Sequence, residues 1–410
     1  MSIIGIDFGT SFCTASWVNP KTNMPEAIMF PNAVNYYKIP SVVMFPAKGT
    51  PVVGYKAYQQ LENAVSAADS DLLQSRTVTS IKRKMQRNGS FLGYSHQSII
   101  SQILSHVVKE AQNAVPFPEP PNRLVLTHPV IFEEWKKSML KAAALEAGFS
   151  EGNITLLDEP VSAALAYIKS NPHVKVQGVL VYDFGGGTFD VAYVQIDHQG
   201  KPLMPIAPDG DPQCGGDDID LLIYDNWDKL AMQQHHRHLT LNPQVADLAF
   251  LSLCRKQKEL LSSSPNERFS QLMPVMEGHS LERCEWKATE AEYNSLIAPI
   301  IDTTMTKTAS ILDAIQQKKL PLDVVLLIGG SSRIPLVHKR LNEMLGGDNL
   351  IKTTGQIDTA VSIGGVYYAL EGYMKQTSKQ ETCFFSYCGK SISTLDAYCM
   401  YCGNKNIMYL

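Results

Sequence analysis

Two short stretches of the sequence combine glycines, hydroxyl side chains and aspartates in a way that could bind a phosphate. "GIDFGTSFC" covers residues 5–13 and "VYDFGGGTFD" covers residues 181–190. In both, Asp-Phe-Gly ends an apolar run that predicts a buried strand, and a second apolar run follows the turn. Each stretch therefore predicts a tight hairpin with a carboxylate at the end of its first strand.

The second stretch does not fit the two common glycine-rich phosphate motifs. A P-loop needs a lysine after its last glycine, and no lysine follows Gly187. A dinucleotide-binding turn needs a third glycine where Asp190 stands. For either stretch alone, an ordinary hairpin whose aspartate accepts from turn amides is the alternative. The presence of both, each opening a strand–helix unit, favours a phosphate site made by duplicated units.

Facing hairpins of this kind predict a specific chemistry. Small residues at the turns let backbone N–H groups approach phosphate oxygens. A carboxylate at a strand end can reach a hydrated Mg²⁺ that bridges those phosphates. On this hypothesis Asp7 and Asp183 face the metal through water, while Thr10, Ser11 and Thr188 supply hydroxyl and amide donors.

Strands and helices that could position these hairpins are visible in the rest of the sequence. Apolar runs followed by helical spacing predict a repeated strand–helix order in both halves. The segments are a strand at 122–129 and a helix at 131–147, a strand and a small-residue helix at 153–170, a buried strand, two glycines and a helix at 323–345, and a second small-residue helix at 358–374.

Composition limits the class of protein. The 410 residues are 44% hydrophobic and 19% charged, which is typical of a globular protein with a large core. The net charge of −4 gives no basic field for nucleic acid. The N-terminal "MSIIGIDFGT" has no basic segment of a signal peptide, and no apolar run approaches a membrane span of about 20 residues. We therefore expect a cytoplasmic protein with no membrane or nucleic-acid partner.

Six motifs in order resemble a known family. They are "GIDFGTSFC", "LDEPVSAALAY", "VYDFGGGTFDVA", "GGDDID", "LLSSS" and "LIGGSSRIP". Together they resemble, over residues 1–374, the nucleotide-binding domain of the seventy-kilodalton heat-shock chaperone family (heat-shock protein 70), within the actin-like ATPase superfamily. The resemblance implies an α/β fold with two lobes, each with a duplicated mixed sheet flanked by helices, around a cleft for ATP or ADP and Mg²⁺.

The resemblance also implies roles for individual residues. Asp7 and Asp183 match the Mg²⁺-side carboxylates, and Glu159 and Asp190 match acidic residues near the attacking water. These four are the expected catalytic residues. The expected nucleotide-binding residues are Gly9, Thr10, Ser11 and Phe12 of the first phosphate loop, Gly185, Gly186, Gly187 and Thr188 of the second, Gly329, Gly330, Ser331, Ser332 and Arg333 of the adenosine loop, and Lys258 and Asp358.

Two departures from the family pattern bear on activity. The family places a catalytic lysine after a "VGxxA" stretch, and here Tyr58 occupies that position. Loss of a lysine that offsets phosphoryl charge would slow hydrolysis more than binding. On the adenine side, Arg255 and Glu259 stand where a glutamate and an arginine are usual, so their charges are exchanged.

The expected organisation is two lobes and a tail. We predict a first lobe at 1–176, a second lobe at 177–374, a polar linker at 375–382 and a cysteine-rich tail at 383–410. The residues after 374 are too few for the peptide-binding domain and lid of a full chaperone, so peptide holding of that kind is not expected.

The tail sequence "CFFSYCGKSISTLDAYCMYCGNKN" resembles a small zinc ribbon. Cys399 and Cys402 form a good zinc knuckle. Phe385 stands where the usual partner of Cys388 would be, and Cys383 can substitute in a Cys-x₄-Cys spacing. Free or redox-active cysteines are the alternative to a four-cysteine Zn²⁺ site.

Two functions remain in competition at the level of sequence. The first is a slow Mg²⁺-dependent ATPase, chaperone-like, whose nucleotide-driven lobe closure regulates a protein partner. The second is a scaffold that holds ATP or ADP without hydrolysis and docks its partner through the tail. A sugar or acyl kinase of the same superfamily is a third possibility, which "GGGTFD" and "GGSSRIP" disfavour.

Overall fold

The structure is a computed structural model, and the chain in it divides into two compact units, Met1–Tyr367 and Tyr368–Leu410. The described residues are 2–31, 36–63, 73, 75–239, 248–263, 268–272, 283–353, 357–372, 381–382 and 391–392.

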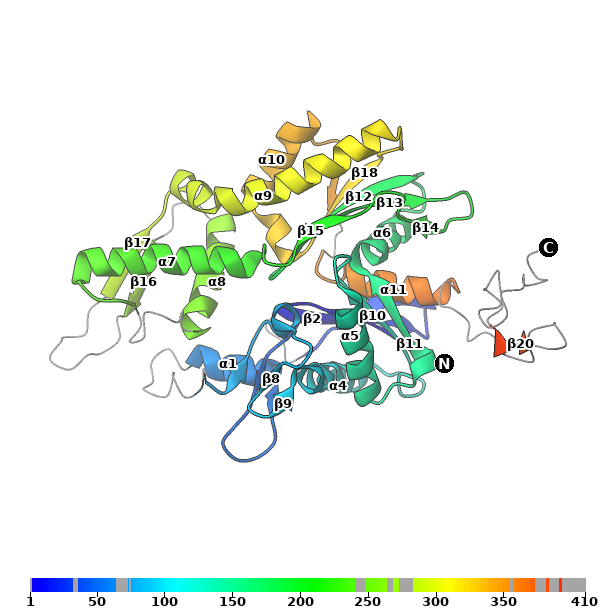
Figure 1. Cartoon of the computed structure of the whole chain (residues 1–410), viewed down its shortest axis with the longest axis horizontal. Coiled ribbons are helices and arrows are strands. Elements are labelled where there is room, and N and C mark those ends of the chain that lie inside the picture. Colours follow the sequence, from blue (N-terminus) through cyan, green and yellow to red (C-terminus); the bar gives the residue numbers. More distant parts are fainter. Residues whose placement is uncertain are drawn as a thin grey trace. The chain divides into compact units, whose positions relative to one another are not determined.

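In the first unit, the first of two large sheets joins an antiparallel hairpin to two parallel strands (Figure 1). Its strands are β1 (Ile3–Phe8), β2 (Phe12–Asn19), β3 (Met24–Ala27), β4 (Ile39–Pro40), β10 (Arg123–His128) and β11 (Ile154–Asp158). β1 pairs with β2 antiparallel and with β10 in parallel, and β10 pairs in parallel with β11. β3 and β4 both pair antiparallel with β2.

The second large sheet repeats this arrangement. Its strands are β12 (Gly178–Phe184), β13 (Phe189–Ile196), β14 (Pro202–Leu203), β15 (Asp209–Asp211), β18 (Val324–Ile328) and β19 (Ile351–Thr353). β12 pairs with β13 antiparallel and with β18 in parallel, and β18 pairs in parallel with β19. The parts of the chain that hold the first and second sheets are called the first and second lobes below. The repeated strand order confirms the predicted duplication.

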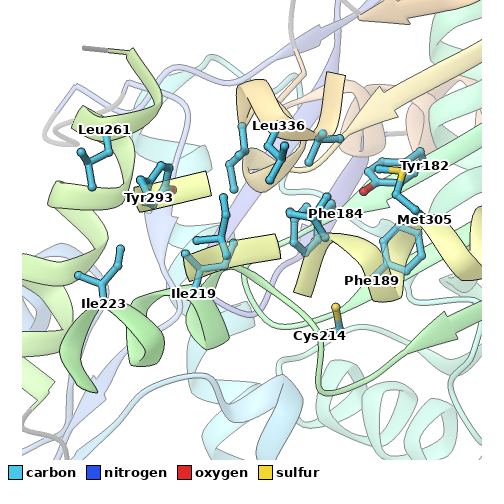
Figure 2. Close-up of a cluster of buried hydrophobic side chains, with 14 of the residues drawn as sticks. Tyr182, Phe184, Phe189, Cys214, Ile219, Ile223, Leu261, Tyr293, Met305 and Leu336 are labelled. Atoms are coloured by element: carbon cyan, nitrogen blue, oxygen red, sulfur yellow. The ribbon is translucent and has the colours of Figure 1, made fainter. Parts of the chain in front are cut away.

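The second hairpin, β12–β13, is anchored by aromatic side chains on one face of its sheet. The Phe189 ring lies 4.8 Å from the Tyr182 ring and 6.1 Å from the Phe184 ring, and Figure 2 shows all three near Met305. Aromatic pairs at these separations attract each other beyond the effect of the area they bury. Because side chains alternate along a strand, this packing turns Asp183 to the opposite face.

The first hairpin, β1–β2, follows the same rule. Ile4, Ile6 and Phe8 of β1 are fully buried in a separate core. Asp7, which lies between two of them, is therefore directed to the other face of its sheet. The alternation thus gives Asp7 and Asp183 equivalent places at the ends of the two hairpins.

Helices pack against both sheets (Figure 1). The helices are α1 (Tyr55–Asn63), α3 (Ile81–Lys84), α4 (His96–Ala114), α5 (Glu134–Glu146), α6 (Glu159–Ser170), α7 (Gly216–His235), α8 (Leu248–Ser263), α9 (Glu290–Gln317), α10 (Pro335–Leu345) and α11 (Ala360–Leu370), with 3₁₀ turns η2 (Glu151–Asn153) and η3 (Gly330–Arg333). α4 contacts β2 and α5 contacts β11, whereas α9 contacts β13 and α10.

Short strands complete the lobes. They are β5 (Val43–Met44), β6 (Val52–Val53), β7 (Thr77–Val78), β8 (Ser90–Phe91), β9 (Tyr94–Ser95), β16 (Arg268–Leu272) and β17 (Arg283–Lys287). No helix among the described residues is long and apolar enough to cross a membrane.

Two helices link the lobes. α6 follows β11 of the first sheet but contacts β12 and β13 of the second. α11 follows the second sheet, yet its Ser362 Oγ lies 2.8 Å from Ser16 Oγ of β2 in the first. The two helices also bond directly, because Ser162 Oγ of α6 donates to the Val361 carbonyl over 2.5 Å. Each sheet therefore packs against a helix that begins in the other lobe.

In the second unit, the described elements are β20 (Glu381–Thr382) and β21 (Ser391–Ile392), which pair antiparallel. The four tail cysteines expected to bind zinc, Cys383, Cys388, Cys399 and Cys402, lie outside the described residues. The predicted domain limits remain predictions.

The contact between α6 and α11 predicts an asymmetric response to two neighbouring glycine substitutions. A methyl group at Gly364 would lie 1.7 Å from the Ser162 carbonyl oxygen, whereas one at Gly365 would first meet a Val125 methyl at 3.1 Å. We expect Gly364→Ala to destabilise the protein by roughly 1–3 kcal/mol, because the helices must separate. Gly365→Ala is the control, and it should leave the free energy of unfolding nearly unchanged. The helix preference of alanine, about 1 kcal/mol, offsets the closer contact with Val125. Denaturant unfolding measures both, and equal stability of the two variants would contradict the prediction.

Candidate functional site

A cavity of about 490 Å³ is lined by residues from both hairpins. Cavities of roughly 300–1,000 Å³ are typical of small-molecule sites. Most of the residues predicted from the sequence line it: Asp7, Gly9, Thr10, Ser11, Phe12, Glu159, Asp183, Gly185, Gly186, Thr188, Lys258, Gly329, Gly330, Ser331, Arg333 and Asp358.

Three predicted residues lie next to the cavity rather than on its wall. Gly187 packs closely against Thr10 of the first hairpin. Asp190 is the register partner of Asp183 on the neighbouring strand. Ser332 is fully buried, and its Oγ donates to the Gly329 carbonyl over 2.7 Å.

Glycine allows the two hairpins to approach each other. A methyl group at Gly186 would come within 2.2 Å of Ser11 Oγ, and one at Gly187 within 2.5 Å of Thr10 Cγ2. Only glycine avoids these contacts, because it has no Cβ. The approach brings the backbones of both turns to the same cavity, which is the arrangement that a phosphate cradle needs.

Acidic side chains and one buried lysine meet beside these turns. Lys82 Nζ of α3 donates to Glu159 Oε1 over 2.7 Å, and both side chains are buried. Asp7 Oδ1 accepts from Thr127 Oγ1 over 3.3 Å. Asp190 Oδ2 is buried and has no hydrogen-bond partner in the part of the chain that the structure describes. An unsatisfied buried acceptor marks a place where a ligand or a water completes the site.

Burial among like charges raises the pKa of the aspartates. Burial and the charge of Glu159 raise the pKa of Asp7 to about 7 and that of Asp190 to about 8. The pKa of Asp183 is also well above its usual range, through burial and then through Glu159 and Asp190. Burial disfavours the Lys82 cation, but Glu159 and Asp7 outweigh this effect and raise its pKa. The excess of acidic groups makes the site favourable for a further cation.

The fit of this site to Mg²⁺ follows from its donor set. The described residues include no group of three or more acidic, histidine or cysteine side chains that could hold a metal ion by themselves. Mg²⁺ commonly keeps several waters and is bound by one or two carboxylates together with substrate phosphates. Asp7 and Asp183 on the cavity wall fit such a site, in which water and phosphate oxygens complete the coordination.

An ion triad spans the cavity on the side predicted for adenosine. Arg333 Nη2 and Lys38 Nζ each lie 2.8 Å from a carboxylate oxygen of Asp358. Burial alone would raise the pKa of Asp358, but Lys38 and Arg333 lower it. Because Lys38 belongs to the first lobe, the triad joins both lobes. The half-exposed Arg333 guanidinium lines the cavity, and a flat cation of this kind can stack on a base.

The cations Arg255 and Lys258 of α8 are neutralised within the second lobe. Arg255 Nη2 lies 2.9 Å from Asp217 Oδ1, and its Nε lies 3.4 Å from Asp220 Oδ2. Lys258 Nζ lies 2.8 Å from Asp220 Oδ1. Glu259 also lines the cavity. The exchanged pair Arg255 and Glu259 therefore changes the local contacts while the cavity remains open.

The prediction that the site lacks a lysine because of Tyr58 is wrong. Tyr58 lines a neighbouring cavity of about 370 Å³, where its hydroxyl lies 3.1 Å from Ser252 Oγ. Lys82 provides the cation on the wall of the site. The basic run "SIKRKMQR" was the available signal, but helical spacing does not show which of its cations is buried.

The raised pKa of Asp190 predicts a pH-dependent effect of Asp190→Asn on stability. Folding without nucleotide takes up a proton between the ordinary carboxyl pKa of 3.8 and the value of about 8 in the folded protein. Wild-type stability should therefore fall as pH rises through this range, and asparagine removes this loss. We expect the variant to melt a few degrees above wild type at pH 8, with a smaller gap at pH 5. Thermal unfolding tests this, with Asp313→Asn in the exposed face of α9 as the control. A gap that does not change with pH would contradict the prediction.

Comparison with known proteins finds relatives that are named as chaperones. It is 29% identical over 371 residues to the chaperone protein DnaK of Thermosipho africanus and equally identical to that of Thermosipho melanesiensis. It is 28% identical to the chaperone protein DnaK of Thermotoga neapolitana. Each match covers 90% of this chain but only 58–59% of the relative. This similarity supports a chaperone-like, ATP-binding protein.

The match to a protein family extends over most of the chain and is not limited to single motifs. A family model described as Hsp70 protein matches residues 73–374, well over half of the chain. The matched range includes Lys82, Glu159, the second hairpin and the predicted adenosine loop. The two sheet-containing lobes agree with the predicted actin-like ATPase fold. The chain belongs to the Hsp70 protein family.

Proposed function

We propose that the chain binds ATP or ADP with Mg²⁺ in the cavity of about 490 Å³ and hydrolyses ATP slowly. The observation that carries the proposal is the meeting of two glycine hairpins, one from each lobe, beside the Lys82–Glu159 pair. The proposed outcome of the nucleotide cycle is closure and opening of the lobes, which regulates a protein partner.

The proposed chemistry assigns separate tasks to the buried side chains. The Lys82 ammonium stabilises the negative charge that develops on the transferred phosphoryl group. Glu159 and Asp190 orient the attacking water, for which Asp190 Oδ2 is a free acceptor among the described residues. Asp7 and Asp183 would hold Mg²⁺ through its water ligands. Bound Mg²⁺ would offset phosphate charge.

Lobe closure is proposed because the nucleotide site is shared. Ser11 Oγ of the first hairpin lies 3.3 Å from Asp217 Oδ1 of α7, and Lys38 pairs with Asp358. A nucleotide that contacts both lobes binds the closed arrangement better than an open one, so it shifts the population toward closure. Loss of the terminal phosphate removes part of this preference, which couples hydrolysis to the state of the lobes.

The alternative is a scaffold that binds nucleotide without cleaving it. Its support was the tyrosine at position 58, and this support is weakened because Lys82 supplies a cation at the site. The relatives are named as chaperones, and the chain spans less than two thirds of their length. We therefore propose a protein partner. Measurement of ATP hydrolysis distinguishes the slow ATPase from the scaffold that does not hydrolyse ATP.

We also propose that Cys383, Cys388, Cys399 and Cys402 bind Zn²⁺ in the tail. The support is their spacing in the sequence, with a Cys-x₂-Cys knuckle at the second pair. So short a segment has little core of its own, so metal binding would supply its folding energy. A ribbon of this kind would dock the protein partner.

Hydrolysis is tested by replacing Lys82. We expect Lys82→Ala to slow single-turnover ATP hydrolysis by roughly 10²–10³-fold, because it removes charge stabilisation in the transition state. ATP affinity should change much less. Lys84→Ala is the matched control, since this neighbour on α3 is exposed and does not line the site. We expect Tyr58→Lys not to raise the rate.

The same measurement distinguishes the two functions. ATP that binds wild type tightly but stays intact for hours would exclude the ATPase and leave the scaffold. An unchanged hydrolysis rate in a folded Lys82→Ala variant would contradict the role given to this lysine.

Zinc binding is tested by metal analysis of purified protein. Wild type should contain close to one Zn²⁺ per chain, and the Cys399→Ser/Cys402→Ser double variant should contain almost none, because two of four ligands are lost. Cys214→Ala, a buried cysteine of the second lobe, is the control and should keep its zinc. Equal zinc content in wild type and the double variant would remove the zinc ribbon.

A further inference from the structure

The short helix α3 is held from both lobes by neighbouring residues. Lys82 donates to Glu159 of its own lobe over 2.7 Å. Arg83 reaches across to α7 of the second lobe, where its Nη1 and Nη2 donate to the two oxygens of Asp218 over 3.0 Å and 2.6 Å. Both partners of this fork are largely buried, at 21% and 19% side-chain exposure. A two-point arginine–carboxylate bond in such a place holds position and direction better than an exposed ion pair.

Ser80, at the N-terminus of α3, makes a second bond to α7. Its backbone is left-handed, with φ 53° and ψ 37°, and its side chain does not cap its own helix. The hydroxyl instead donates to Asp217 Oδ2 over 2.7 Å. A non-glycine residue in this conformation has a cost that surrounding contacts must offset, and such residues gather at functional sites.

The acceptors on α7 are also held by hydrogen bonds within the second lobe. Asp218 Oδ2 accepts from the Gly215 backbone N–H over 2.8 Å at the start of the helix. Asp217 Oδ1 accepts from Arg255 Nη2 of α8 over 2.9 Å. Carboxylates in the first turn are also stabilised by the positive end of the helix. The two aspartates therefore form a rigid acceptor pair on the second lobe.

We propose that Arg83 is a positioning residue that couples closure of the lobes to the placement of Lys82. Successive residues on a helix point about 100° apart, so one rigid turn directs Lys82 into the site and Arg83 toward α7. When α7 moves away, the bonds of Ser80 and Arg83 are lost and α3 keeps the Lys82–Glu159 pair. The lysine is then less precisely held beside the phosphate hairpins. This inference rests on the proposed function in one respect, namely that Lys82 acts on a nucleotide.

The first test needs neither nucleotide nor turnover. Acetic anhydride labels accessible lysines, and mass spectrometry gives the rate at each site. We expect Arg83→Gln and Asp218→Asn each to raise the labelling rate of Lys82 several-fold, because α3 is released from α7. Arg340→Gln, at a surface arginine of α10 that pairs with Asp302, is the matched control and should leave this rate unchanged. Lys82 labelling at the wild-type rate in both test variants would overturn the inference.

The second test distinguishes a role of Arg83 in positioning Lys82 from a role in only holding the lobes together. If Arg83 positions Lys82, Arg83→Gln should lower the single-turnover hydrolysis rate by roughly 10–100-fold, the cost of a small misplacement, with little change in ATP affinity. The charge-reversed pair Arg83→Asp/Asp218→Arg should recover part of the rate. Faster nucleotide release with an unchanged hydrolysis rate would show that Arg83 only holds the lobes together. This result would overturn the inference. If wild type itself does not hydrolyse ATP, the proposed function fails, while the labelling test still decides whether α7 restrains α3.

Discussion

The buried ion pair between Lys82 and Glu159 is the interaction on which the site depends. Without a cation, Glu159, Asp7, Asp183 and Asp190 would be too costly to bury together in ionised form, because burial and the charge of Glu159 raise the pKa of all three aspartates. The Lys82–Glu159 pair offsets part of this cost. The raised pKa values of the aspartates show that the compensation is incomplete. The site is therefore favourable for a further cation, and a divalent ion such as Mg²⁺ would lower the cost of keeping these carboxylates ionised.

The parts of the fold that follow from local pattern could be predicted from the sequence. Both hairpins, the small-residue helices and the repeated strand order depend on strand alternation and on glycine at close contacts such as Gly186. The same alternation explains why Asp7 and Asp183 both lie on the cavity wall.

The location of the lysine could not be predicted, because it depends on tertiary packing. Lys82, Arg83 and Lys84 are consecutive cations, yet the first is buried, the second is paired across the cleft and the third is exposed. Nothing in their local sequence separates these environments. The environment of Tyr58 is set by tertiary packing in the same way, since its partner Ser252 is 194 positions away in the chain.

The contact between α6 and α11 bears on which elements the proposed lobe motion would displace most. Ser162 and Gly364 hold these two helices in close contact, so the lobe motion proposed above would be a rotation about this contact. Under rotation, displacement grows with distance from the pivot. Elements that meet across the lobes away from the pivot, such as α1 and α8, would therefore move more than the pivot itself. A partner that binds both of these helices would respond to the bound nucleotide without contacting it.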